Sequence, residues 1–578
     1  MSIVVAGKEY IIPQGVAYFE KTPPARAADV AVNNCLIVGE AGGGVPYNVN
    51  VNDLPPIYTF TNPTEARAIL KSGDGLNSLL ESFSHGSQRI FFLRSQSSAG
   101  TVPATQAEFD DATNKIKIKS ADYADFGNRL SVEHDFTTGA PDTVITKLRL
   151  YNLGAVIVAK ATATSSATTV LTHTGKGFDT LGLVAFNSTN KTGDLLHIID
   201  DNSTGAKNGY YPVVSWDANT VTVAPALGTL TAPIYEIVRV ASVEIEESDA
   251  MAVDNATVNQ WLNETGSIRQ YITSEVTGTA SIALDVAETR LYGGADGEAD
   301  ATDVETALSK CVSVNAQLRH IASSDSAIFG KLPAHITEAL NAGYPSIGFV
   351  GGASADSVAT IKGYATTFDN DRMAVCAPAN QDRDLNNVLG LIGGWAVAAK
   401  VMGVASSLDP GVPLTHKNIQ AVGLSSVYTK AEREELQQAG VLIVQETPDG
   451  KQIQKGVTTL QDNTNLWTAG LNPKTPEISL RRMADAISSR VARGTGRDFV
   501  GQNARYAGAG LEGYLEATLV DIRDNDKWIM DGVDETTGEP VPAYEIYRVY
   551  KVADAYYADA GLNFSDPVNF VVFKGIIL

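Results

Sequence analysis

Ser346-Ile347-Gly348-Phe349-Val350-Gly351-Gly352 is the stretch that decides the fold of this chain. A short apolar run that ends in a glycine pair predicts a buried strand followed by a turn. Residues 357–368 are predicted to form a helix, and residues 372–377 (RMAVCA) a second buried strand. Because strand, helix and strand follow one another, the stretch predicts an α/β fold.

The same alternation continues on both sides of this stretch. On the N-terminal side, the predicted elements are the strands 34–39 and 89–94 and helices that begin at Asn62 and Leu76. The predicted helices 257–273 and 303–321 also lie on this side. On the C-terminal side, the predicted elements are the helix 389–404 and the strand 441–444. Thr429-Lys430-Ala431-Glu432 reads as a capping box, which predicts that a further helix begins there.

Residues 97–245 differ in composition from the rest of the chain. They are rich in Thr, Ser, Val, Ala, Asn and Gly, and they contain short alternating runs such as residues 115–119 (KIKIK) and 220–223 (TVTV). Alternation of apolar and polar residues between frequent turn signals is typical of antiparallel strands. The sequence therefore predicts an inserted antiparallel β domain.

Length and composition together predict a multidomain protein of the α/β (α+β) class. At 578 residues the chain is too long for one hydrophobic core. Its hydrophobic content of 44% and charged content of 19% are ordinary for a folded protein. The predicted divisions are an N-terminal arm (1–28), a first α/β segment (29–96), the inserted β domain (97–245), a central α/β domain (246–465) and a C-terminal domain (466–578).

Charge and cysteine content argue against several functions. A formal net charge of −22 disfavours binding to nucleic acid or to anionic membranes, since both require a basic surface. Cys35, Cys311 and Cys376 lie far apart in the sequence, so they predict neither a disulfide framework nor a zinc site. No signal sequence and no apolar stretch of about 18 residues is visible, so we expect synthesis in a cytoplasm and no membrane span.

Both ends of the chain read as apolar strands. A terminal strand must enter its own sheet or complete the sheet of a neighbour, because a bare one is an aggregation edge. The residues predicted to pair between subunits are Ile3, Val4, Val5, Tyr10 and Ile11 at the N-terminus and Phe570, Val571, Val572, Phe573 and Ile576 at the C-terminus. The alternative is that each end is an ordinary strand of its own domain.

No motif in the sequence supports catalysis. The glycine-rich stretch 39–44 follows a strand, but Val45-Pro46 continues it where a dinucleotide-binding turn would open a helix. The acidic stretch 521–526 lacks the glycine and the distal glutamate of an EF-hand loop, so a solvated turn explains it better than calcium. No nucleophile, base and oxyanion set can be assembled. We therefore predict no catalytic, cofactor-binding or metal-binding residue.

One predicted helix, residues 477–497, carries a stripe of arginines. At about 100° per residue, Arg482, Arg490, Arg493 and Arg497 fall on one arc. The adjoining arc carries the apolar residues Leu480, Met483, Ile487 and Val491. On an acidic protein such a stripe is a candidate docking face for an acidic partner, and the alternative is a solvated helix face.

The order of several motifs resembles that of the sheath proteins of contractile phage tails and related injection machines. The matching stretches are residues 13–17 (PQGVA), 79–94 (LLESFSHGSQRIFFLR), 291–297 (LYGGADG), 413–445 and 566–575. Gln14 interrupts the PGVY pattern that opens sheath subunits. The stretch 291–297 resembles the GGxDG loop of the family and is the most specific match. The matches cover the two ends of the chain and residues 246–578, and none falls within residues 97–245.

This resemblance implies a non-enzymatic subunit that polymerises as stacked hexameric rings around an inner tube. The terminal arms would add strands to the C-terminal domains of neighbouring subunits, and contraction would drive the tube through a cell envelope. The implied partners are other copies of the chain, the inner tube protein, and baseplate and tail terminator proteins, in a virion tail. The four arginines would then face the tube.

Two other classes of protein are compatible with the sequence. A large α/β enzyme or ligand-binding protein would place its site at the strand ends in residues 346–377. A capsid or tube protein would also be a polymer with exchanged arms.

Overall fold

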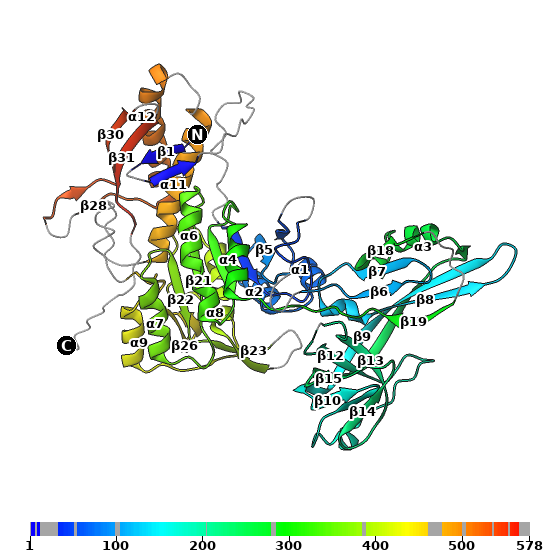
Figure 1. Cartoon of the computed structure of the whole chain (residues 1–578). Helices are drawn as coiled ribbons and strands as arrows, with labels where there is room; N and C mark the ends of the chain where they lie inside the picture. Colours follow the sequence, from blue (N-terminus) through cyan, green and yellow to red (C-terminus); the bar gives the residue numbers. More distant parts are fainter. Residues whose placement is uncertain are drawn as a thin grey trace.

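The computed structural model describes residues 2–5, 8–11, 33–50, 55–98, 104–203, 205–278, 285–383, 389–460, 477–499, 504–533, 537–552 and 555–565. The molecule is elongated (Figure 1). An α/β core lies between a β-rich body, which we call the outer body, and a smaller C-terminal part made of helices and a hairpin.

The core is built on one eight-stranded sheet with the order β27-β26-β22-β21-β20-β3-β5-β4. The strands from β26 to β5 are parallel, and the two edge strands are antiparallel to their neighbours. In chain order the strands are β3 (Cys35–Gly39), β4 (Tyr58–Phe60), β5 (Ile90–Arg94), β20 (Leu318–Ala322), β21 (Ile347–Val350), β22 (Met373–Ala377), β26 (Val441–Thr447) and β27 (Gly450–Ile453). The predicted α/β class is confirmed.

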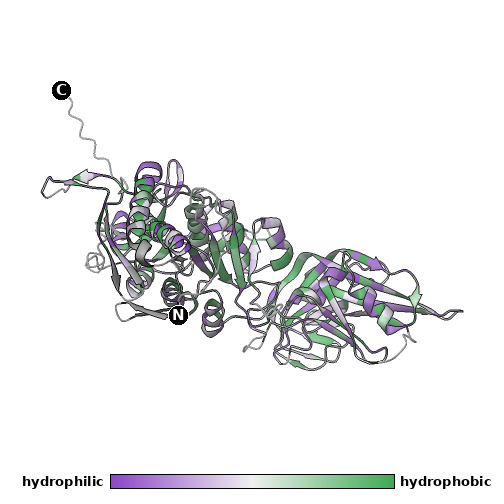
Figure 2. Cartoon of the chain, turned by 90° about the horizontal axis from the view of Figure 1, so that it is seen from above, coloured by the Kyte–Doolittle hydropathy of each residue, from purple (hydrophilic) through white to green (hydrophobic). Residues whose placement is uncertain are grey.

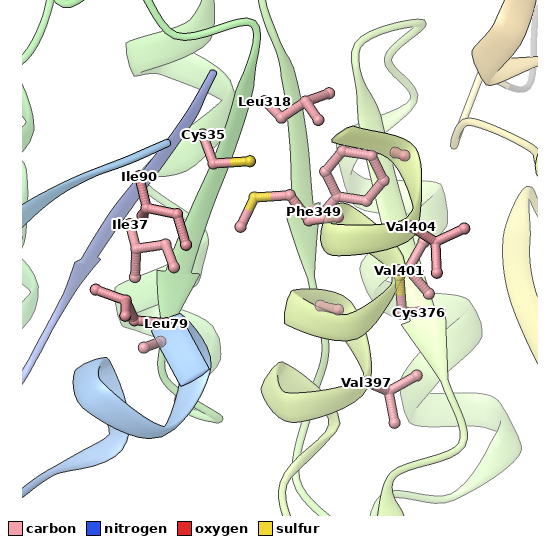
Figure 3. Packing of buried hydrophobic residues seen from close by; sticks show 14 of the residues in the cluster. Cys35, Ile37, Leu79, Ile90, Leu318, Phe349, Cys376, Val397, Val401 and Val404 are labelled. Carbon is pink, nitrogen blue, oxygen red and sulfur yellow. The ribbon is translucent and has the colours of Figure 1, made fainter. Parts of the chain in front are cut away.

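Helices cover both faces of this sheet. One face carries α1 (Pro63–Leu70), α2 (Asp74–Ser84) and α8 (Gly394–Ser407). The other face carries α4 (Ala301–Ser309), α5 (Ser326–Phe329), α6 (Leu332–Asn341), α7 (Val358–Phe368) and α9 (Lys430–Gln438). Figure 3 shows the first layer, in which Phe349 and Cys376 of the sheet pack with valines of α8. The capping box predicted at Thr429 is present at the start of α9.

Three predicted helices are shorter than expected. Residues 257–273 form α3 (Asn255–Leu262), a turn and the beginning of strand β18 (Ile272–Val276). Residues 303–321 contain α4 and then the buried strand β20. Residues 389–404 begin with strand β24 (Leu389–Ile392), which pairs with β23 (Asn380–Arg383) before α8 starts. Turn-favouring residues lie at or shortly after these breaks: Asn263 caps the C-terminus of α3, Asn315 lies between α4 and β20, and Gly393 lies between β24 and α8.

The outer body is antiparallel. Its main sheet is organised around the long strands β9 (Thr143–Thr162) and β16 (Ile234–Glu247), and β8 (Leu130–Thr137) and β19 (Val286–Arg290) extend it. The outer body thus continues to residue 290, past the predicted boundary at 245. The reason is that β18 and β19 return to pair with β7 (Ile116–Ser120) and β8. Further strands are β6 (Glu108–Asp111), β7 (Ile116–Ser120), β10 (Ser165–Ala167), β11 (Val170–Thr172), β12 (Asp194–Asp200), β13 (Gly209–Trp216), β14 (Thr220–Val223), β15 (Leu230–Thr231) and β17 (Met251–Ala252).

A buried arginine and a glycine-rich loop join the core to the outer body. Arg94, at the end of β5, donates to the carbonyl oxygens of Tyr123 and Asp296 at 2.6 and 2.5 Å. Gly294 approaches so closely that a Cβ atom there would lie 2.5 Å from the Ala124 carbonyl oxygen. The stretch 291–297 is therefore glycine-rich for a steric reason, because its backbone packs directly on the outer body.

Candidate assembly surfaces

The C-terminal part contains two helices and a long hairpin. The helices are α11 (Ile478–Asp498) and α12 (Ala504–Asp521), followed by the π-helical turn η4 (Ile522–Asp526). Short strands β28 (Gly532–Val533) and β29 (Pro540–Val541) precede the hairpin of β30 (Tyr544–Val552) and β31 (Ala555–Leu562). Ile546 and Leu562 of the hairpin pack against the apolar cluster of Met483, Leu519 and Trp528.

The β30–β31 hairpin forms a sheet of its own. Among the described residues, neither strand pairs with a third strand, so each leaves one edge of backbone N–H and C=O groups unpaired within the chain. A two-stranded hairpin of this length is marginally stable by itself, and its open edges are templates for a further strand. The hairpin is therefore a candidate acceptor for a strand from another copy.

The N-terminal strands form a hairpin within the chain. β1 (Ser2–Val5) pairs antiparallel with β2 (Lys8–Ile11), so that Ile3 lies opposite Tyr10 and Val4 opposite Glu9. The prediction that this region is extended is correct, while its pairing with another subunit stays a prediction. The C-terminal residues Phe570, Val571, Val572, Phe573 and Ile576 lie outside the described residues. The last described residue, Ser565, donates its backbone N–H to the Trp528 carbonyl oxygen.

Helix α11 is seated by the apolar stripe that the sequence predicted. Met483 and Ile487 are buried in the C-terminal cluster, and Leu480 and Val491 pack against its margin. A helix whose apolar arc is buried must turn its opposite arc towards solvent or a partner. The positions of the four arginines relative to that arc decide which of them are accessible.

Arg482 is not a surface residue, which corrects the prediction that it faces a partner. Its side chain is 5% exposed, and Nη2 donates to Asn33 Oδ1 at 3.1 Å and to the Leu408 carbonyl oxygen at 2.8 Å. Burial lowers the pKa of this guanidinium to about 10. Arg482 thus binds α11 to the core and is not available to contact an external partner.

Arg490 is also used within the chain. Its Nη1 lies 2.5 Å from Asp526 Oδ2 and 3.5 Å from Asp521 Oδ2, and its guanidinium lies 5.2 Å from the ring centre of Trp528. These contacts attach α11 to the turn after α12, so the prediction of a tube-facing Arg490 does not fit its geometry. The acidic stretch 521–526, which is not an EF-hand loop, supplies the carboxylates that pair with Arg490.

Arg493 and Arg497 remain candidates for an external contact. Both are exposed on the last turns of α11. Arg493 Nη2 donates to Asn315 Oδ1 at 3.1 Å, and Arg497 Nε lies 2.7 Å from Asp498 Oδ1. Exposed pairs of this kind contribute only about 0–1 kcal/mol, so a partner can replace them at little cost.

Sequence analysis missed the ion pairs that hold α11 on the core sheet. Asp485 accepts two hydrogen bonds from Arg372, at 2.6 and 2.7 Å, in a pair that is nearly buried. Arg481, one turn before Asp485, contacts both Asp485 and Asp371. The i,i+4 spacing of Arg481 and Asp485 was a visible signal of a paired face.

Comparisons with known proteins agree with this architecture. No family model matches the sequence. A tail sheath protein of Bacillus phage SP01 is 22% identical over 524 residues, which is 86% of this chain and 85% of the phage protein. The crystal structure of a sheath tail protein from Desulfitobacterium hafniense superposes with a TM-score of 0.53 at 12% identity, covering 95% of this chain and all of that one. A sheath tail protein from Listeria innocua gives a TM-score of 0.52 at 11% identity, covering 93% and 98%.

The chain has the tail sheath fold. Its sequence resembles that of a tail sheath protein over most of its length.

The alternative of a ligand site at the strand ends in 346–377 meets a steric obstacle. A Cβ atom on Gly351 would lie 2.2 Å from the Gly394 carbonyl oxygen, and Gly394 donates its N–H to the Gly352 carbonyl oxygen at 2.7 Å. The start of α8 therefore occupies the space directly beyond β21. Within the described ranges, no group of histidine, cysteine and acidic side chains could hold a metal ion. None of the described helices is both long and apolar enough to cross a membrane.

Proposed function

We propose that the chain is the repeating subunit of a contractile tail sheath. It would polymerise as stacked hexameric rings around an inner tube and contract to drive that tube through a cell envelope. Support comes from the tail sheath fold over nearly the whole chain and from the resemblance of its sequence to a phage tail sheath protein. The role is structural, and the location is the tail of a virion.

The observation that carries the proposal is the β30–β31 hairpin with its two open edges. In a polymer, an extended terminal segment of a neighbouring copy would add a strand to each edge, with backbone hydrogen bonds giving affinity. The apolar segments Ile3–Ile11 and Phe570–Ile576 are the donors of suitable composition. Strands exchanged in this way keep subunits connected while their bodies slide and rotate.

The inner tube is the proposed partner of the last turns of α11. Arg493 and Arg497 would contact acidic groups on the tube, and baseplate and tail terminator proteins would bind the two ends of the sheath. Weak ionic contacts suit a surface that must release during contraction. No catalytic step is part of this proposal.

Negative-stain electron microscopy of the purified chain tests the proposal. We expect striated hollow tubules from the full-length protein. A variant lacking residues 569–578 should remain a folded monomer, with the circular dichroism spectrum of the full chain, and form no tubules. Dispersed particles from the full-length protein under all assembly conditions would contradict the proposal, and unfolding of the truncated variant would assign the last strand to its own core.

A further inference from the structure

A cluster of charged side chains lies where four segments of the outer body meet. His197 of β12 stands between two carboxylates, with Nε2 2.7 Å from Asp125 Oδ1 and Nδ1 3.0 Å from Glu236 Oε1. Its ring stacks on Tyr210 of β13 at a centroid distance of 4.0 Å, and the Tyr210 hydroxyl donates to Asp125 Oδ2 at 3.0 Å. Both ring nitrogens therefore face acceptors, which requires a proton on each.

The electrostatics of the cluster favour a charged imidazole. Burial by itself acts to lower the pKa of His197, but Asp125 and Glu236 outweigh it and raise the pKa to about 9. Burial likewise acts to raise the pKa of Asp125, and His197 outweighs it and holds that pKa at about 2. Arg129 adds positive charge beside Asp125, and burial raises the pKa of Tyr210 well above its usual value, so the phenol stays neutral.

The cluster is continuous with the joint to the core. Asp125 is the first residue of the 3-10 helix η1 (Asp125–Arg129), and its backbone N–H donates to Asp296 Oδ1 at 2.9 Å. Asp296 also accepts the hydrogen bond from Arg94 at the end of the core strand β5. A chain of polar contacts thus runs from His197 in the outer body to the edge of the core sheet.

We propose that His197, Asp125 and Glu236 form a charge clasp that fixes the orientation of the outer body on the core and opens in alkaline solution. While His197 is protonated, it joins η1 to β12 and β16. When it loses its proton, one ring nitrogen faces a carboxylate with no hydrogen between them, and that side of the clasp separates. The imidazolium gives its proton to hydroxide, and no other bond is made or broken.

The sign of the pH dependence follows from the raised pKa of His197. The folded state holds the proton more tightly than the unfolded state, so the clasp contributes its full stability below pH 6.5. That contribution declines as pH rises and is lost once pH exceeds about 9. Each pH unit within this window changes the opening equilibrium by up to about tenfold.

Hydrogen exchange read by mass spectrometry on the full chain tests the clasp. His197→Gln keeps a polar side chain but carries no charge, and His173→Gln is the matched control, since His173 lies in the same body and bonds Tyr235 at 2.8 Å. Compared with wild type at the same pH, we expect H197Q to exchange at least about tenfold faster over residues 124–129 and 194–200 at pH 7.5. The ratio should fall towards one at pH 10.5, where the wild-type imidazole is also neutral.

The control and a second measurement make the test decisive. H173Q should exchange like wild type in both segments at both pH values. If the exchange rate of H197Q divided by that of wild type were the same at the two pH values, His197 would have only a packing role and the clasp would be overturned. Small-angle scattering of unassembled chains, separated from any tubules by size-exclusion chromatography, should show a different maximum dimension for H197Q than for wild type at pH 7.5. Identical scattering curves would overturn the role of the clasp in orientation.

Discussion

The α/β core and the outer body bury their interiors in different ways. Core strands are covered on both faces, so every residue of β3 is buried, and so is α8 from Gly394 to Ser406. Strands of the outer body alternate, as in β7, where buried and partly exposed residues take turns. Figure 2 shows hydrophobic colour concentrated on the ribbon of the core, and the buried side chains there pack between the sheet and its helices. The core is thus held by apolar layers, whereas the outer body depends on long antiparallel pairing and is joined to the core by polar contacts.

Deleting the outer body at two different boundaries gives the largest expected contrast. Removing residues 98–292 and joining the ends with a short Gly/Ser linker takes away the whole body, so the core should stay soluble and still form tubules. Removing residues 97–245 leaves Val258, Leu262 and Ile272 without the strands that cover them. Exposed apolar surface of this kind leads to aggregation.

Size-exclusion chromatography and electron microscopy of the two deletion variants check this contrast. If the variant lacking residues 97–245 were soluble and the variant lacking residues 98–292 aggregated, the inference that the outer body ends near residue 290 would be wrong. A folded 98–292 variant that makes no tubules would place the outer body among the lattice contacts.

Two cavity mutations test whether the regions unfold separately. Phe349 in the core and Phe178 in the outer body are both fully buried, and each belongs to a different apolar cluster. Phe349→Ala and Phe178→Ala should each cost about 3–5 kcal/mol of unfolding free energy. In calorimetry we expect each mutation to lower the melting temperature of its own region only. A single transition that both mutations shift equally would show that the two regions unfold as one unit.

The same difference explains which elements the sequence could predict. Buried parallel strands read as continuous apolar runs, so residues 347–350 and 373–377 were identified without knowledge of their partners. Strand β24 was assigned to a helix because four residues carry too little pattern to separate the two periods. The end of the outer body depends on pairing between β8 and β19, residues more than a hundred positions apart, which local pattern does not encode.

The candidate assembly surfaces could also be predicted only in part. The apolar stripe of α11 follows from helical periodicity and was placed correctly. The accessibility of its arginines depends on distant groups: Arg482 is held by Asn33 and the backbone of Leu408, and Arg490 by Asp526. A helical wheel contains no information on these partners.

Acid should destabilise the core through a buried neutral histidine. His320 of β20 bonds the Phe349 carbonyl oxygen at 2.8 Å and Ser78 Oγ at 3.1 Å, and burial lowers its pKa to about 4. Since the unfolded chain takes up a proton near pH 6.5 and the folded core does not, stability falls as pH drops from 6.5 to 4. The loss due to His320 should reach about 3 kcal/mol at the acid end of this window.

This effect is measured by urea unfolding of the full chain at several pH values between 7 and 4, which gives the unfolding free energy of the core at each pH. His320→Gln should flatten the pH dependence, whereas His416→Gln, at an exposed position, should leave it as in wild type. His134 in the outer body has its pKa lowered by burial to about 4, so its region should share the acid sensitivity. An unchanged pH profile in H320Q would contradict the assignment of a neutral His320.

The smallest effect on folding is expected where helix α11 of the C-terminal part meets its proposed outside partner. Arg493 and Arg497 are exposed, and their contacts are with Asn315 and the neighbouring Asp498. Replacing both arginines by glutamate should change the unfolding free energy by less than about 0.5 kcal/mol, as is usual for surface positions. The same double variant should fail to assemble around purified inner tubes while still forming tube-free tubules, because only the tube contact reverses in sign. Arg490→Glu is the matched comparison: it places a third negative charge beside Asp526 and Asp521 and should destabilise the C-terminal part itself. Co-sedimentation with tubes at low and high salt measures the loss of the tube contact, and thermal unfolding measures the destabilisation of the C-terminal part. Normal assembly of the Arg493 and Arg497 double variant on tubes would remove these arginines from the tube contact and leave α11 with a purely internal role.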